Sequence, residues 1–370
     1  MDRVEMYVLG SNADIKGRPT RDQTLAELEG WVRTKEIDDP RKAPQRIIDN
    51  LMIAERYQWT EIYTEAFVHG AGRYDYISSL PDFAFVSPAT RQLLERASYS
   101  IKARVHGTQT SLSTLNFSMF SPTRSRHQRR AHRGSRSDES NTMDIPRAWR
   151  KSYRSFREWV IQYYTGVFRV KSWPPAHFSR GMILMLKNDF QALYELLLDP
   201  APEMNDQYRR LLAQVLTEFD GNPYPPLPRL PVLPPEGSPS RDRRQNRENI
   251  SVVLLDSYNL IGNASNKFVE AFKEFERSYG TGRVVTKSVE AREGRWCLVH
   301  AVVSTLRSVV GEWEGLKYRW GVEYWLCAEL KGIPPWTARR SAERSTSSVG
   351  LFGAPETDEG VTSRRPSIFG

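Results

Sequence analysis

The sequence predicts a mostly α-helical protein: a helical bundle domain, a smaller N-terminal helical module and long disordered linkers. Three observations predict this fold class. In several long segments apolar residues recur at spacings of three and four, which is the pattern of an amphipathic helix. Hydrophobic residues make up 39% of the 370 residues and aromatic residues 11%, enough for a sizeable core. In other stretches apolar residues do not recur at regular spacing. Such stretches cannot bury one side of a helix or strand, so they are predicted to be disordered.

The N-terminal helical module is predicted over residues 1–106. The segment Trp59–Gly70 has one apolar stripe, and a second stripe precedes it around Leu51. Ser87 followed by Pro88 predicts a helix start, because serine caps the first turn and proline fits its first position. The apolar MYVLG near residue 1 is typical of a chain that begins inside a fold, so we expect a shortened gene product.

Two carboxylates of this module, Glu61 and Glu65, stand four residues apart on one predicted helix. A pair of carboxylates can support acid–base chemistry. At this spacing on an amphipathic helix, however, we expect both side chains to lie on an exposed face as ordinary solvated charges.

A basic disordered linker is predicted over residues 107–143, which are rich in Ser, Thr, Arg and His. Its arginines suit either a nuclear-targeting or polyanion-binding patch, or solvated charge in a phosphorylatable linker. No aromatic side chains alternate with them for base stacking, so sequence-specific binding of nucleic acid is not expected. The arginines of this basic patch are Arg124, Arg126, Arg129, Arg130, Arg133 and Arg136.

The larger helical domain is predicted over residues 144–336. Its first helix, residues 147–169, has an aromatic face and an arginine-rich opposite face. Such a helix can lie on an anionic membrane surface or in an acidic groove. The same spacing is typical of a bundle helix that buries its rings, which is the interpretation we prefer. The stripe consists of Trp149, Tyr153, Phe156, Val160, Tyr163 and Val167.

Four further helices are predicted in this domain. Two follow the first at once, over residues 177–199 and 204–221, and the others occupy residues 250–279 and the segment from Val299 to Trp313. The segment GVEYWLCAELKGIPPW suits a strand by its length and aromatic content but has no evident pairing partner. We therefore allow at most a short strand or two near 315–330. Residues 337–370 are predicted to form a disordered tail.

A proline-rich strap, residues 221–247, interrupts the helical domain. It contains the stretch PPLP, which matches the pattern that one class of WW domain binds in a polyproline II conformation. The alternative is a stiff connector between the two halves of the domain, which we prefer. The candidate partner-binding residues are Pro225, Pro226, Leu227 and Pro228.

Candidates for catalysis are few. Cys297 and His300 stand three apart on one helical face, where a thiolate–imidazole pair is geometrically conceivable. The surrounding residues are apolar, which is typical of a buried cysteine and a buried histidine instead. The GTGR of residues 280–283 follows a helix rather than a strand, unlike a phosphate-binding loop. No metal site, cofactor or enzymatic activity is predicted.

The net charge and the cysteine content indicate in which cellular compartment the protein is expected. The formal net charge is +9, and the sequence contains only two cysteines, so a reducing intracellular compartment, cytoplasm or nucleus, is expected rather than secretion. No signal peptide or membrane span is apparent. Ser341 and Ser367 each follow arginines in the pattern of basophilic kinase sites, which is a short and common pattern.

Two stretches resemble known proteins. WTEIYTEAFVHG and VEYWLCAELKGIPPW are similar to segments of large uncharacterised proteins of filamentous fungi that carry a domain of unknown function. The helices from Pro44 to Phe67 are also similar to the helical region of fungal BTB (POZ) interaction modules, although the strand and helix that open that fold are missing. Neither resemblance implies a catalytic residue, a cofactor or a substrate.

From these observations we expect a non-catalytic intracellular scaffold or adaptor that binds protein partners, with phosphorylation in the linker and tail. The alternatives are a peripheral membrane protein that uses the basic aromatic helix and an unrecognised enzyme that uses Cys297 and His300.

Overall fold

The computed structural model describes residues 21–117, 146–199, 226–231, 253–254, 256–259, 266–280, 285–310, 315–331 and 333–336. Within these ranges the protein is mostly α-helical, as predicted, and no β-strand forms apart from an isolated bridge between Leu198 and Pro228. The elements are α2 (Arg21–Thr34), α3 (Pro44–Tyr57), α4 (Thr60–Gly72), α5 (Tyr74–Ile77), the 3-10 helix η1 (Pro81–Phe85), α6 (Pro88–Thr114), α8 (Arg147–Val167), α9 (Arg180–Leu197), α12 (Lys267–Gly280) and α13 (Val285–Val310).

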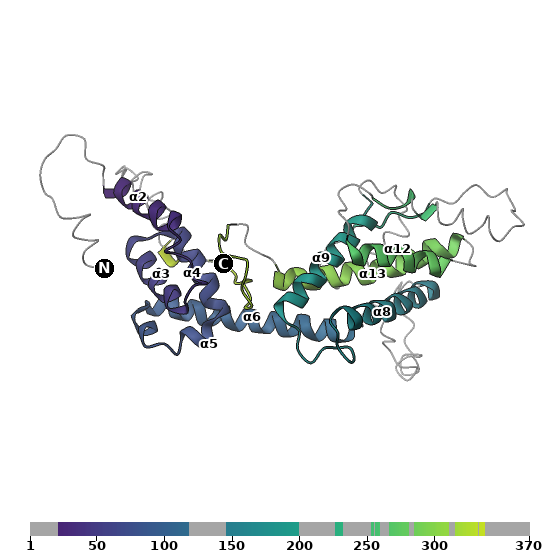
Figure 1. Ribbon diagram of the computed structural model, residues 1–370, viewed down its shortest axis with the longest axis horizontal. Coiled ribbons are helices and arrows are strands. Elements are labelled where there is room, and N and C mark those ends of the chain that lie inside the picture. Colours follow the sequence, from purple (N-terminus) through teal and green to yellow (C-terminus); the bar gives the residue numbers. More distant parts are fainter. Residues whose placement is uncertain are drawn as a thin grey trace, which may run out of the picture.

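The helices form two groups, which Figure 1 shows on either side of the long helix α6. The N-terminal lobe comprises α2 to η1 and the first part of α6. The C-terminal lobe comprises α8, α9, α12, α13 and the last part of α6. Each lobe has its own packed helices, so α6 is the element that both share.

The core of the N-terminal lobe lies between α3, α4 and α6. The predicted stripes are confirmed, since Ile47, Leu51 and Phe67 are completely buried. The predicted start of α6 is also confirmed: Ser87 Oγ accepts a hydrogen bond from Thr90 N at 3.3 Å, with proline in the first turn. This cap satisfies a main-chain donor that the helix leaves unpaired.

Helix α6 extends further than the sequence predicted. It continues to Thr114, so the predicted boundary at residue 106 and the start of the linker at 107 were placed too early. The extra turns are stable because Leu112 and Leu115 are buried and Thr108 Oγ1 lies 3.2 Å from Ser308 Oγ on α13. The sequence did not predict these turns, because most residues of the segment are polar and only a few make these contacts.

The C-terminal lobe is built around α13, which packs on α8 and α9. At the crossing with α8, Gly294 lies directly against the backbone of Trp149. The aromatic face of α8 is buried there, and Phe156 packs its ring edge on Phe272 of α12 with centroids 5.5 Å apart. This confirms the bundle packing, with Tyr164 buried where the sequence analysis had placed Tyr163, and with Val167 41% exposed.

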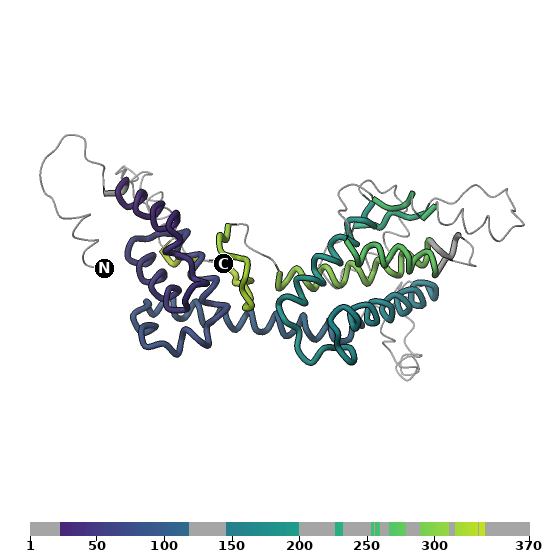
Figure 2. Tube along the Cα trace, viewed as in Figure 1, coloured from purple at the N-terminus to yellow at the C-terminus, as the bar shows by residue number. Residues whose placement is uncertain are grey.

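The described part of the chain ends in an irregular segment, residues 315–336, which we call the C-terminal arm. The sequence placed it in the C-terminal domain, with a short strand as one option. Instead the arm leaves the end of α13 and lies against the N-terminal lobe (Figure 2). No strand forms in its described residues, because helices and side chains, not another strand, provide its hydrogen-bond partners.

Several predicted elements lie outside the described residues. These are the first 20 residues, most of the basic linker, the helix over 204–221, most of the proline-rich strap, part of the segment 250–279, and the tail from residue 337.

Candidate functional site

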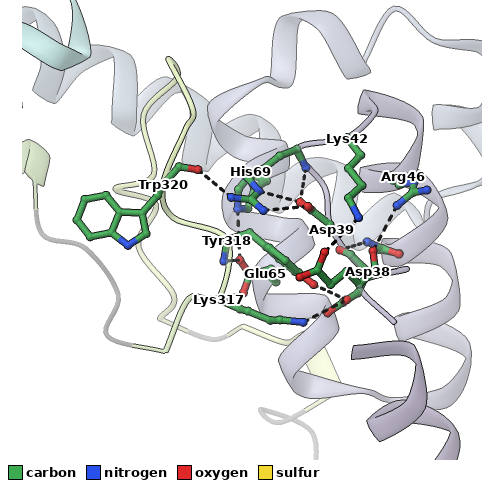
Figure 3. A network of polar contacts seen from close by, with 12 residues as sticks. Asp38, Asp39, Lys42, Arg46, Glu65, His69, Lys317, Tyr318 and Trp320 are labelled. Atoms are coloured by element: carbon green, nitrogen blue, oxygen red, sulfur yellow. Dashed lines mark hydrogen bonds and ion pairs between the residues drawn. The ribbon is translucent and has the colours of Figure 1, made fainter. Parts of the chain in front are cut away.

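Glu65 of α4 is the centre of the contact between the C-terminal arm and the N-terminal lobe (Figure 3). Its carboxylate accepts hydrogen bonds from two successive amides of the arm, Lys317 N at 2.9 Å and Tyr318 N at 2.8 Å. The prediction that Glu65 is a solvated surface charge is therefore wrong, since only 4% of its side chain is exposed. Burial alone would raise the pKa of Glu65, but His69 and the two arm amides lower it below its ordinary value.

A second contact fixes the side chain of Tyr318. Its hydroxyl donates to Asp38 Oδ1 at 2.8 Å, and its ring lies 4.9 Å from the guanidinium of Arg41. Arg41 in turn pairs with Asp39 at 2.9 and 3.0 Å and donates to the carbonyl of Trp320 at 3.1 Å. Both aspartates are about 1% exposed, so this end of the arm is held by buried charged groups.

A third contact joins His69 and Tyr324. His69 Nδ1 lies 2.6 Å from the hydroxyl of Tyr324, and His69 Nε2 lies 3.3 Å from Glu65 Oε1. Burial raises the pKa of Tyr324 to about 12, with Arg73 opposing the shift, so the phenol keeps its proton at neutral pH. Glu65, His69 and Tyr324 therefore form a line of polar groups that ends on the arm.

The arm also fits the lobe by shape. Gly72 at the end of α4 leaves room for the main chain of Trp325, and a Cβ there would overlap the Trp325 carbonyl oxygen. At the end of the described arm, the ring of Trp336 meets Tyr63 edge to face, with centroids 4.9 Å apart. Residue 72 is thus required to be glycine, because the two backbones approach too closely to leave room for a Cβ.

The middle of the arm contacts the other lobe. Arg180, at the start of α9 and 8% exposed, donates to the Val322 carbonyl at 2.9 Å. Arg104 of α6 donates to the Cys327 carbonyl at 2.5 Å and to the Ser308 carbonyl at 3.3 Å. The arm consequently lies where the two lobes meet and is bonded to both.

In chemical terms this site binds a main chain. Charged side chains of the lobes hold amides and carbonyls of an irregular segment, while two phenol hydroxyls bond to the buried side chains of Asp38 and His69. Glu65 and His69 are groups that often transfer protons in enzymes, but here their polar atoms contact the arm or each other. We call Asp38, Asp39, Arg41, Glu65, His69 and Gly72 together the arm-binding site.

The predicted partner-binding residues of the proline-rich strap lie in the C-terminal lobe. Leu227 and Pro228 are buried, and the Leu227 carbonyl accepts from Asp199 N at 2.9 Å. The Pro226 carbonyl accepts from Trp296 Nε1 at 3.1 Å. A WW domain would have to detach these residues before it could bind them. Pro225 lies outside the described residues.

Cys297 and His300 lie inside the same lobe, on α13. Cys297 is completely buried and His300 is 2% exposed, beside the rings of Tyr194 and Trp296. Burial raises the pKa of the Cys297 thiol well above its ordinary value, and the nearby Glu293 raises it further. The thiol is therefore neutral at physiological pH, whereas a nucleophile requires the thiolate.

This placement predicts the reactivity of both cysteines. In the native protein at pH 7.5, we expect Cys297 and Cys327 to react slowly with iodoacetamide, because each side chain is at most 4% exposed. In denaturant both should react at the rate of a free thiol. Mass spectrometry of tryptic peptides separates the two sites. Rapid native alkylation of Cys297 would contradict the buried, neutral thiol and return the nucleophile hypothesis to consideration.

Glu293 contributes a second ionisable group to the core of the C-terminal lobe. Trp149 Nε1 donates to Glu293 Oε2 at 2.6 Å, and the carboxyl is 8% exposed. Burial raises its pKa to about 7, the hydrogen bond from Trp149 partly offsets this, and Glu290 adds to it. The folded protein thus retains a proton at this carboxyl that the unfolded chain releases near pH 4.5.

The free energy of unfolding should therefore fall as pH rises from about 4.5 to 7, since over this range the folded state binds the extra proton. Above pH 7 the full penalty applies, at most ~3 kcal/mol for a shift of this size. Glu293→Gln should remove this pH dependence and stabilise the protein at pH 8 but not at pH 4.5. Urea titrations at both pH values measure it. Glu158→Gln, at an exposed position on α8 and not among the groups that shift the pKa of Glu293, is the control. Equal stabilisation at both pH values would contradict the shift.

The other predicted sites are placed as follows. On α8 the side chains of Arg150, Lys151 and Arg154 are exposed, while the aromatic face is covered by α12 and α13. The predicted basic patch and the phosphorylation candidates Ser341 and Ser367 lie outside the described residues. The patch consists of Arg124, Arg126, Arg129, Arg130, Arg133 and Arg136.

Two features are absent from the described ranges, a membrane-spanning helix and a metal-ligand cluster. Every helix there is too short or too polar for a membrane span. Among the same residues, no three His, Cys, Asp or Glu side chains are grouped so as to hold a metal ion.

Comparison with known proteins identifies one region. Residues 25–117 match a family model described as Domain of unknown function (DUF8004). No curated protein and no solved structure matches the chain. The matched region begins within α2 and includes α3 to α6, so it carries all the residues of the arm-binding site but not the arm. The resemblance of Trp59–Gly70 to an uncharacterised domain is confirmed to this extent; the second resembling stretch lies outside the match.

Proposed function

We propose that the chain is a non-catalytic scaffold or adaptor in which the C-terminal arm holds two helical lobes in a fixed relation. The observation that carries this proposal is the double attachment of the arm. Glu65 of the N-terminal lobe binds its amides at 317 and 318, and Arg180 of the C-terminal lobe binds its carbonyl at 322. A segment bonded to both lobes restricts their relative motion.

The use of polar groups supports the non-catalytic part of this proposal. Glu65, His69 and Tyr324 contact one another and the arm, and Cys297 is a buried neutral thiol. Three groups that the sequence offered for chemistry, Glu65, Cys297 and His300, thus have a role in packing or in binding the arm. We also propose an intracellular location, since a chain with two buried thiols suits a reducing compartment.

Gly72→Ala tests the scaffold role. The added Cβ would overlap the Trp325 carbonyl oxygen and lie 2.9 Å from Tyr324 Cδ2, so the arm should detach from the N-terminal lobe. Spin labels at exposed positions 76 and 162, one in each lobe, report the distance between lobes. We expect one narrow distribution in the wild type and a distribution at least about twice as broad in the variant, because the bond between lobes is lost.

Two controls accompany this experiment. Gly107→Ala changes an exposed glycine of α6 with open space around it and should leave the distance distribution narrow. Alkylation of Cys327, which is buried in the arm, should rise in Gly72→Ala, while Cys297 in the core stays protected. A narrow distribution in a variant whose Cys327 has become reactive would show that the arm does not fix the lobes, and would overturn the proposal.

A further inference from the structure

The contacts of the C-terminal arm have the form of a bound peptide. Four charged side chains hold its main chain: Glu65 accepts from two amides, and Arg41, Arg104 and Arg180 donate to the carbonyls of Trp320, Cys327 and Val322. Bonds to amides and carbonyls do not depend on the identity of the arm's side chains. Recognition of an extended segment through its backbone, with pockets for selected side chains, is a common mode of peptide binding.

Selectivity comes from two tyrosines spaced six residues apart. Tyr318 donates to the buried carboxylate of Asp38, and Tyr324 shares a hydrogen bond with the buried ring of His69. A phenylalanine at either position would leave a buried polar group of the lobe without this partner, which is costly. The main chain after the second tyrosine then passes over Gly72, where only glycine fits.

The arm-binding site and the arm belong to different parts of the sequence. The family match over residues 25–117 includes all the residues of the arm-binding site and ends about 200 residues before the arm. A surface that belongs to a recurring domain, and that is occupied here by a distant segment, need not bind that segment alone. Covalent linkage gives the arm an effective concentration on the order of millimolar, so a competing segment must bind the site more favourably.

We propose that the arm-binding site is a peptide-recognition site, that the C-terminal arm is its intramolecular occupant, and that an extended partner segment with the pattern Tyr-x5-Tyr displaces it. The proposal rests on the adaptor function above and names the partner chemistry of the same site. The exposed ring of Trp320, which points away from the helices, is not part of the pattern (Figure 3).

The test uses the full chain and a fluorescein-labelled peptide with the sequence of residues 315–336. In the wild type the attached arm competes, so fluorescence anisotropy should show weak binding. The double variant Tyr318→Phe, Tyr324→Phe loosens the arm and leaves the site intact. Each lost hydroxyl should favour the added peptide about tenfold, so the variant should bind the peptide at least about tenfold more tightly than the wild type.

Two matched controls show where the peptide binds. A peptide with phenylalanine at both tyrosine positions should not show this increase in affinity for the double variant. Adding Glu65→Gln to the loosened chain should also reduce peptide binding by about tenfold or more, because the carboxylate that accepts both amides is lost. Glu61→Gln, an exposed change on the same helix, should leave binding unchanged.

Alkylation of Cys297 and Cys327 shows whether only the arm is loosened or the core as well. Reactive Cys327 with protected Cys297 shows a loosened arm on an intact core, and if the peptide then binds no more tightly than to wild type, the proposal is overturned. If both thiols react, Tyr324→Phe alone replaces the double variant. Dimers of the loosened chain that exclude the peptide would assign the site to a second copy and also overturn the proposal. The spin-label distances remain a separate test of the scaffold, since they can narrow or broaden whether or not the peptide binds.

Discussion

Glu276→Gln is expected to destabilise the C-terminal lobe by about 3–5 kcal/mol. Glu276 is 2% exposed and accepts hydrogen bonds from Arg292 at 2.5 and 3.1 Å, from Arg295 at 2.6 Å and from the hydroxyl of Tyr258 at 2.5 Å. Burial alone would raise the pKa of Glu276, but Arg292 and then Arg295 lower it below the ordinary value. A glutamine is neutral and removes the charge with which Glu276 offsets the two buried guanidinium groups.

The substitution at Glu276 should also affect residues outside this buried cluster. Arg292 also donates to the carbonyls of Ser257 and Arg229, so it fixes the described part of the proline-rich strap. Urea unfolding followed by far-UV circular dichroism measures the loss of stability. Glu274→Gln is the matched control, because its side chain is 74% exposed and pairs with Arg277 at the surface. That change should cost less than about 1 kcal/mol. Equal effects of the two variants would show that the buried cluster does not stabilise the fold.

Gly294→Ala is expected to cost about 3 kcal/mol, the upper range for an overpacked core. A Cβ at this position would lie 2.5 Å from the Trp149 carbonyl oxygen and 2.8 Å from its Cα. Both are backbone atoms, so no side-chain rotation relieves the overlap and helices α8 and α13 must separate. The gain in helix propensity from glycine to alanine, about 1 kcal/mol, is too small to compensate.

Gly166→Ala, on α8 itself, provides the comparison for this substitution. No atom lies within 4 Å of the added Cβ there, so the variant should be neutral or slightly more stable. Thermal unfolding of both variants at one pH measures the difference. Because the buried rings of α8 pack at the same crossing, the expected loss for Gly294→Ala should be accompanied by a red shift of tryptophan fluorescence. A stabilised Gly294→Ala protein would contradict the close crossing.

Local features were predicted well where a residue's neighbours in sequence decide its position. The stripe that begins at Trp149 and the cap at Ser87 depend on helical periodicity and on a turn of a few residues, and both were confirmed. The end of α6 was missed, because Leu112 and Leu115 pack on residues that are distant in sequence. A helix end that depends on tertiary contacts has no local signal.

The arm-binding site was the part that sequence reasoning missed. The sequence analysis expected Glu65 to be exposed. The helical pattern assigns a residue to one face of the helix, but it does not show which distant segment covers that face. One signal was present: the two stretches that resembled the same uncharacterised proteins contact each other, through His69 and Tyr324. Shared resemblance of distant segments is a reason to expect that they meet in space.

The sequence by itself determined the helices and the faces that they bury, because apolar spacing and capping act within a few residues. Only the tertiary structure decided that a segment near residue 320 lies on a helix near residue 65, since that contact depends on buried charge, close backbones and the path of α6. Burial of a carboxylate becomes favourable only when its hydrogen-bond donors arrive, and here the donors come from the far end of the chain.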